Sequence, residues 1–273
     1  MINKTRHIPK EARDFQWRVP FGGFRWTPKE TSASGRHLIP AGEWVEWRST
    51  WPLKDEPALF RLLAELAPEE DSIRRFADEH GQLRSNEELR PAESTIVDWA
   101  VRISGMRMAI QLHDGVRARD AKEFDGLIKI ENGAAVVEPR LIGHLPGLGD
   151  FWELPKQPAE LDEPRLLLWR AKTVVKRIAE HCIFWSGLRP RFDDDPAASN
   201  LSLSRVPTTL LGALWLQFAF WVQGGRSFPE CKQCGKRFAA ALDKRRAGTD
   251  FCSDACRARQ IPRSIFTRAG GFD

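Results

Sequence analysis

The chain has 273 residues, of which 42% are hydrophobic and 29% charged, with a formal net charge of +5. This composition is typical of a globular protein and provides enough residues for one large or two modest domains. Residues 1–14 are polar and charged and lack the apolar core of a secretory signal. The longest apolar run, 210–222, falls short of the roughly 20 residues that cross a bilayer. We therefore expect a cytoplasmic protein without membrane partners.

The first 50 residues are rich in aromatic residues, proline and glycine. Trp47 and Trp51 would share one face of either a strand or a helix, and the nearby Pro52 favours a short strand. Packing in a core is the favoured role of these aromatic side chains, and an exposed stacking surface is the alternative. We predict an N-terminal arm with short strands over residues 1–52.

Helical patterns dominate the next part of the chain. Asp55 is predicted to cap a helix that has Pro57 in its first turn and these residues on one face: Leu59, Leu62, Leu63 and Leu66. A second helix is predicted to open at Pro68 and stop at Gly81, with these side chains inward: Ile73, Phe76, Ala77 and His80.

The clearest helical pattern runs from Pro91 to about Arg119. Its apolar seam recurs at spacings of three and four residues: Ile96, Trp99, Ile103, Met106, Ile110 and His113. On that seam, His113 is interpreted as a hydrogen-bonded core histidine and not as a ligand.

Between the helices, Asn132-Gly133 separates two short apolar stretches and predicts a β-hairpin at about 127–138. A long loop is predicted to follow, and then a helix from about Pro164 to Gly187 in which Cys182 faces the core. Residues 186–207 are interpreted as loop, and their three adjacent aspartates, 193–195, as a solvated turn in preference to a cation site.

A nearly all-apolar helix is predicted from Thr208 to Val222, and Gly224-Gly225 ends it. The prediction for residues 53–225 is therefore a helical domain with one hairpin. The fold class is mainly α with small β elements, and a separate C-terminal module follows at 226–273.

Four cysteines define that module, in the pattern C-x2-C, 17 residues, C-x3-C. Each pair can supply two adjacent ligands from one turn, and this spacing is typical of a structural zinc site. Gly235 favours a left-handed turn after the first pair, and Ser253 is a good N-cap for a short helix that ends before Pro262. The predicted zinc ligands are Cys231, Cys234, Cys252 and Cys256.

Two other interpretations of the cysteines are less favourable. Two disulfides would fit a secreted protein, for which the chain gives no other indication. A thioredoxin-like redox pair would need a surrounding βαβ pattern and would leave the second cysteine pair unexplained.

The segments CKQCGKRF and FCSDACR are similar to treble-clef zinc fingers at the C-termini of many bacterial proteins. They also resemble the CGNR-type finger of bacterial regulators, in which a helical domain precedes the finger. The likeness covers about 30 residues, and this chain reads Cys-Arg-Ala-Arg at 256–259 in place of the CGNR tetrapeptide. The resemblance implies a treble-clef fold with these cysteines as ligands.

Positive charge is concentrated in the same module. From Arg226 to Asp273 there are 11 Lys and Arg against 5 Asp and Glu, whereas the rest of the chain has 31 against 32. Such a patch would bind phosphates with salt-dependent affinity, or would only offset the thiolate charge. The candidate nucleic-acid-binding residues are Lys236, Arg237, Lys244, Arg245, Arg246, Arg257 and Arg259.

An enzymatic function is not predicted. The sequence has no Gly-rich phosphate loop, no G-x-S-x-G and no H-E-x-x-H, and no histidine lies in the module to activate water. We expect a zinc protein that binds DNA or RNA as a regulator, while the helical domain senses a signal or forms a homodimer. The alternative is a structural zinc module that binds a protein partner without nucleic acid.

Overall fold

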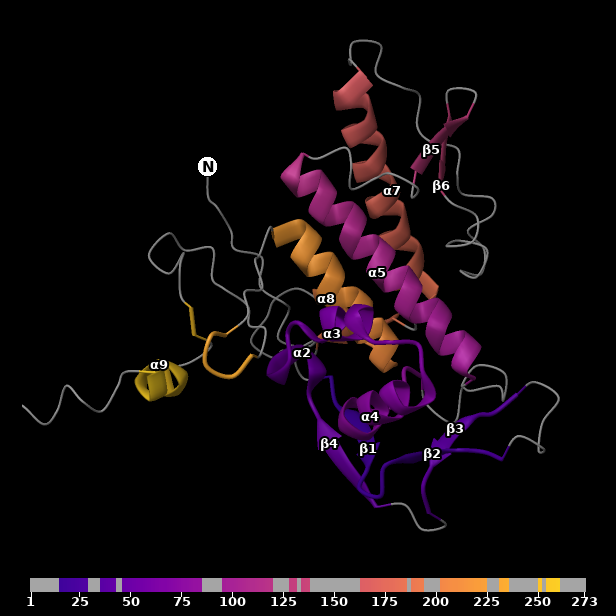
Figure 1. Cartoon of the computed structure of the whole chain (residues 1–273), viewed down its shortest axis with the longest axis vertical. Helices are drawn as coiled ribbons and strands as arrows, with labels where there is room; N and C mark the ends of the chain where they lie inside the picture. The colour runs from indigo at the N-terminus through magenta and orange to yellow at the C-terminus, as the bar shows by residue number, and fades with distance from the viewer. Residues whose placement is uncertain are drawn as a thin grey trace, which may run out of the picture.

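The structure, a computed structural model, describes residues 15–28, 35–42, 46–84, 95–119, 128–131, 134–137, 163–185, 188–193, 202–224, 231–235, 250–251 and 254–260. Within these ranges the protein is mainly helical with small antiparallel sheets, as predicted (Figure 1). The helices are α2 Pro52–Asp55, α3 Leu59–Glu65, α4 Glu70–His80, α5 Ile96–Ala118, α7 Glu163–Trp185, α8 Leu210–Gly224 and α9 Asp254–Gln260. The strands are β1 Trp17–Pro20, β2 Phe24–Trp26, β3 Leu38–Pro40, β4 Trp47–Thr50, β5 Ile128–Glu131, β6 Ala134–Val137, β7 Leu188–Asp193 and β8 Ser202–Pro207.

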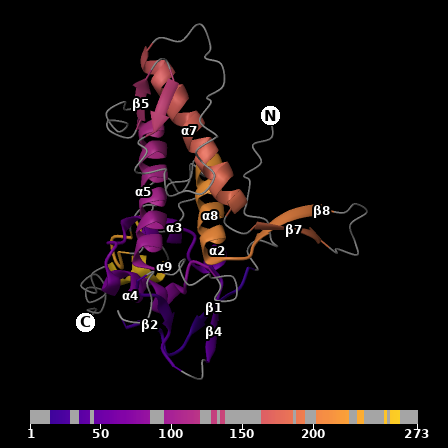
Figure 2. The same cartoon turned by 90° about the vertical axis from the view of Figure 1, so that its right-hand side faces the viewer.

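Three long helices, α5, α7 and α8, lie side by side and form the helical body together with α3 (Figures 1 and 2). The predicted apolar helix near residue 210 is confirmed as α8, whose side chains are buried along nearly its whole length. Thr209 begins it, because its Oγ1 accepts a hydrogen bond of 2.9 Å from the Gly212 N–H. Among the described residues, no helix is long and apolar enough to cross a membrane.

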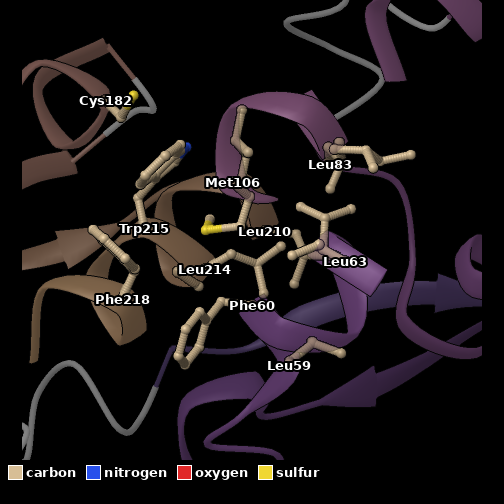
Figure 3. Packing of buried hydrophobic residues seen from close by; sticks show 14 of the residues in the cluster. Leu59, Phe60, Leu63, Leu83, Met106, Cys182, Leu210, Leu214, Trp215 and Phe218 are labelled. Atoms are coloured by element: carbon tan, nitrogen blue, oxygen red, sulfur yellow. The ribbon is translucent and has the colours of Figure 1, made fainter. Parts of the chain in front are cut away.

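The core between these helices is dominated by large apolar side chains. Phe60 and Leu63 of α3 meet Met106 of α5 and Leu214 and Phe218 of α8 (Figure 3). Burial of such side chains stabilises the fold by about 1.5–3 kcal/mol each. The helical body is therefore held mainly by contacts between segments that are far apart in the sequence.

One polar side chain lies inside this apolar core. Gln217 of α8 is buried, and its Oε1 accepts a hydrogen bond of 3.2 Å from the Phe60 N–H. Its Nε2 donates to the backbone carbonyls of Pro52, at 2.9 Å, and of Glu56, at 2.8 Å. A single amide thus links α8 to the backbone of α2 and α3.

The N-terminal strands form two separate two-stranded antiparallel sheets. In one sheet β1 pairs with β4, with Trp17 opposite Thr50, and in the other β2 pairs with β3. Both sheets contact α4. The strand predicted near Trp47 is confirmed, and the core role of the aromatics holds only in part. Phe15, Trp17, Phe24 and Trp26 are buried, whereas Phe21, Trp47 and Trp51 are exposed.

The helix α4 matches its prediction closely. Its buried side chains are the predicted ones, Ile73, Phe76, Ala77 and His80, and Gly81 is its C-cap. Gly81 has a φ of +95°, and a Cβ there would lie 2.5 Å from Nε1 of Trp17. Glycine at this position therefore satisfies both the backbone conformation and the close approach of β1.

The predicted role of Asp55 is wrong. Asp55 is the last residue of the short helix α2, and α3 begins only at Leu59, after Ala58, which makes no side-chain cap. Glu56 precedes Pro57 and has a φ of −134° and a ψ of 71°, outside the helical region. Proline disfavours helical backbone in the residue before it, so the chain forms two helices where one was predicted. Leu59 and Leu63 are buried as expected, but Leu62 is exposed.

Residues 186–207 were predicted as loop, and this prediction is also wrong. β7 and β8 form an antiparallel hairpin, in which Leu188 pairs with Pro207 and Asp193 pairs with Ser202. The hairpin extends away from the ends of α7 and α8 (Figure 2). Proline disrupts a central strand but is tolerated in a two-stranded ribbon, where one side of each strand needs no partner, so Pro190 did not exclude this structure. Of the three aspartates, 194 and 195 lie outside the described residues.

The hairpin predicted at about 127–138 and the helix predicted from about Pro164 are both confirmed. β5 and β6 form the predicted hairpin, with Ile128 opposite Val137 and its turn residues outside the described ranges. α7 has Cys182 in the core as predicted, together with Ala171, Val174 and Ile178. Burial raises the pKa of the Cys182 thiol, which keeps it protonated and suits its interpretation as a core residue.

The helix α5 begins later than predicted, at Ile96, where the Thr95 side chain accepts a hydrogen bond from the Asp98 N–H. Its seam is buried from Trp99 to His113, with Ile96 partly buried, and the burial of His113 confirms the core interpretation. In the part of the chain that the structure describes, one ring nitrogen of His113, Nε2, lacks the hydrogen bond that a buried histidine was expected to make. Within the described ranges, neither Nε2 of His113 nor Nε1 of the adjacent Trp221, whose ring centroid is 4.2 Å away, has a hydrogen-bond partner.

His113 should make the fold sensitive to acid. Burial, together with the charges of Arg117 and Arg61, lowers the pKa of His113 from 6.5 to about 4. In the unfolded chain, by contrast, His113 takes up a proton as the pH falls through 6.5. We expect stability to fall as the pH drops from 6.5 towards 4, with no further loss from this group below that pH. Urea unfolding at pH 7 and at pH 5 measures this change. Between these two pH values the free energy of unfolding should fall less in His113→Leu than in the wild type. Equal losses would contradict the assignment.

Candidate metal centre

Three of the four predicted zinc ligands lie together. The Sγ atoms of Cys231, Cys234 and Cys256 all lie within 4.8 Å of one another. Cys231 and Cys256 are buried, and Cys234 is exposed. Cys252 lies outside the described residues. Residues more than 20 positions apart in the sequence therefore converge on one small site.

The first cysteine pair is held by the turn that the sequence predicted. Gly235 has a φ of +70°, and its N–H donates a hydrogen bond of 2.8 Å to the carbonyl of Cys231. Left-handed backbone of this kind is readily adopted by glycine. The turn lets Cys231 and Cys234 offer their thiols from the same side of the chain to one ion.

A contact that the sequence analysis missed brings the second half of the module beside this turn. The Lys232 N–H donates to the Asp250 carbonyl at 2.9 Å, and Lys232 Nζ lies 2.9 Å from Asp250 Oδ2. Asp250 precedes Cys252 by two positions in the sequence. The only sequence signal for this contact was the opposite charge of Lys232 and Asp250, and many other pairs of residues in the chain also have opposite charges.

Cys256 comes from the short helix α9. The helix begins at Asp254 and ends at Gln260, so Cys256 lies in its first turn, and the helix stops before Pro262 as predicted. Ser253, the predicted N-cap, lies outside the described residues. Figure 1 shows α9 to one side of the helical body.

The three thiols can hold a metal ion. Zinc–sulfur bonds of about 2.3 Å in a tetrahedral site place the sulfur atoms about 3.8 Å apart, which is compatible with the observed cluster. No disulfide joins any of the cysteines within the described ranges. Cys182 is on α7 in the helical core and is not part of the cluster.

Of the predicted nucleic-acid-binding residues, the structure describes two. Arg257 and Arg259 are exposed on α9, next to the ligand Cys256. The other five lie outside the described residues: Lys236, Arg237, Lys244, Arg245 and Arg246. The described part of the module thus combines a thiol cluster with a short, exposed, basic helix.

Comparison with known proteins gives no match to a family model, a curated protein or a solved structure. The treble-clef fold, the identity of the metal and the division at residues 52 and 225 therefore stay predictions.

Proposed function

We propose that residues 226–273 form a four-cysteine zinc module of the treble-clef type. In this proposal the protein is a regulator that binds DNA or RNA through the module. The proposal rests mainly on one observation: three thiols converge at the start of a helix that exposes arginine side chains. The fourth ligand in the proposal is Cys252, which the C-x3-C spacing places in the same cysteine pair as Cys256.

Zinc is the metal proposed, because four thiolates suit a tetrahedral site and leave no open position for a substrate. Thiolate ligands must be deprotonated, so binding couples the metal to the folding of this segment. In the proposal the ion holds α9 against the Cys231–Gly235 turn, and no reaction takes place at the metal.

Nucleic acid is the proposed partner because positive charge is concentrated in the module. The segment has an excess of six positive charges, and four thiolates with one divalent ion would reduce this excess to about four. Binding of phosphates by lysine and arginine releases counterions, so the affinity would fall steeply with salt. The helical body would then sense a signal or form a homodimer.

The test is a fluorescence-anisotropy titration of the zinc-loaded full chain against a random-sequence DNA duplex and an RNA of equal length, at 50 and 200 mM salt. Arg257→Ala with Arg259→Ala should weaken binding and lower the salt slope by about one for each lost phosphate contact, at unchanged zinc content.

The matched control removes two positive charges from the helical body, with Lys172→Ala and Lys176→Ala on the exposed side of α7. These substitutions should leave the salt slope unchanged. If the wild type does not bind either nucleic acid, or the α9 variant and the wild type have the same affinity and slope, the proposal is wrong. A protein-docking module then becomes the better interpretation.

A further inference from the structure

A second group of metal-ligating side chains lies outside the cysteine site, where the end of α4 meets the segment after α2. It consists of Glu56, Glu79 and His80, which each offer one ligand atom within 4.8 Å of the others. Glu56 Oε2 is 3.5 Å from His80 Nδ1, and Glu79 Oε2 is 3.8 Å from His80 Nε2. Both separations are longer than the 2.7–2.9 Å of a charge-assisted hydrogen bond.

The group is compatible with one ion, because its three ligand atoms, one from each residue, all lie within 4.8 Å of one another. Metal–ligand bonds of about 2.0–2.2 Å and tetrahedral angles place two ligand atoms about 3.4 Å apart. One ion needs only one of the two imidazole nitrogens, and the exposed Glu79 side chain can adjust to either. His80 is buried, and its ring packs on Phe76 with the centroids 4.7 Å apart. The imidazole is therefore the fixed member of the group.

The backbone that carries the three side chains is also held in place. Arg48 of β4 donates from Nη2 to the carbonyls of Asp78 and Glu79, at 2.9 and 2.8 Å. The Glu56 carbonyl accepts a hydrogen bond from the buried Gln217. Positions far apart in the sequence are thus fixed relative to one another before any ion binds, as a preorganised site requires.

A pocket of about 190 Å³ adjoins the group, lined by Glu56, Glu79 and His80 and also by Arg48, Ser49, Thr50, Trp51 and Asp55 among others. At about 30 Å³ per water, it has room for an ion with several waters. Its lining includes three carboxylates and one guanidinium, so with neutral His80 the net charge is −2. A divalent cation would neutralise this charge.

We propose that Glu56, Glu79 and His80 bind a divalent first-row metal ion, of the Mn²⁺ or Zn²⁺ kind, whose remaining coordination positions face the pocket and hold water. Imidazole together with carboxylates suits such ions better than Ca²⁺, which takes oxygen ligands alone. This site is independent of the cysteine module and of its proposed function.

The test uses the full-length protein, loaded with one equivalent of zinc for its cysteine site and freed of excess zinc, and titrated with Mn²⁺ while the EPR signal of free Mn²⁺ is recorded. The wild type should bind one equivalent of Mn²⁺. Glu79→Gln should bind it about tenfold or more weakly, since it removes one charged ligand. This substitution is chosen because the Glu79 side chain is 67% exposed, so the fold tolerates it. Glu56→Gln should weaken binding to a similar extent.

The matched control is Glu69→Gln, which makes the same change of charge at the opposite end of α4. Glu69 is exposed and directly precedes the first residue of this helix. This variant should bind Mn²⁺ like the wild type. A Cys231→Ser variant should also keep the Mn²⁺ site. Three results would each overturn the proposal: no Mn²⁺ bound by the wild type, unchanged binding in both glutamate variants, or loss of the site in Cys231→Ser.

Discussion

Replacing Cys231 with serine should release the metal and unfold the C-terminal module, while the helical body stays folded. Cys231 is 1% exposed, so it is the best shielded of the three described thiols. Structural zinc contributes roughly 10–16 kcal/mol to the folding of small finger peptides. Among the described side chains of the module only Cys231 and Cys256 are buried, so little other burial would replace that contribution, and we expect the loss of one thiolate to unfold the module. Metal content per chain and limited proteolysis after residue 225 are the measurements.

The helical signal provides the second measurement for this variant. The long helix α7 packs on both α5 and α8, so the helical body has its own core and the far-UV circular dichroism should stay close to that of the wild type. Cys182→Ser is the matched control, because the same atom is changed at a buried position outside the cluster. It should lower the stability of the body and leave the metal content unchanged. Metal retained in Cys231→Ser, or lost in Cys182→Ser, would contradict the ligand assignment.

Patterns with a short range could be predicted from the sequence. The α4 segment places its four buried side chains at helical spacing and ends on a glycine, so both its face and its end were correct. The cysteine spacing likewise predicted a site that the fold assembles from Cys231, Cys234 and Cys256. In both cases the signal is a spacing of three or four residues, within the helix and within each cysteine pair, where backbone preference decides the local structure.

The split between α2 and α3 was missed for a local reason, Pro57, whereas the other errors depended on partners that are distant in the sequence. The β7–β8 hairpin forms by pairing two segments with weak individual preferences for strand. The Glu56, Glu79 and His80 group joins positions over 20 residues apart, and no short motif marks it. The exposure of Trp47 depends on which face of its sheet packs on α4, which alternation alone does not specify.

Gln217 is another residue whose partners are distant in the sequence. In the sequence it only interrupts an apolar run, but in the structure it makes three hydrogen bonds with backbone groups more than 150 positions away. We expect Gln217→Leu to lower the free energy of unfolding by about 3 kcal/mol, at about 1 kcal/mol for each lost hydrogen bond. The added apolar surface offsets little of this, because the leucine would face polar backbone atoms of α2 and α3. Urea denaturation followed by circular dichroism measures the change.

The matched control is Gln223→Leu, the same substitution on the same helix at an exposed position. It should change the free energy of unfolding by no more than about 0.5 kcal/mol, as is usual for surface sites. A second consequence separates the role of Gln217 from general packing. Glu56 is one of its backbone partners and a proposed ligand of the second metal site, so Gln217→Leu should also weaken Mn²⁺ binding, and Gln223→Leu should not. If Gln217→Leu proved as stable as the wild type, apolar packing of α8 alone would hold α2 and α3, and the buried amide would have no structural role.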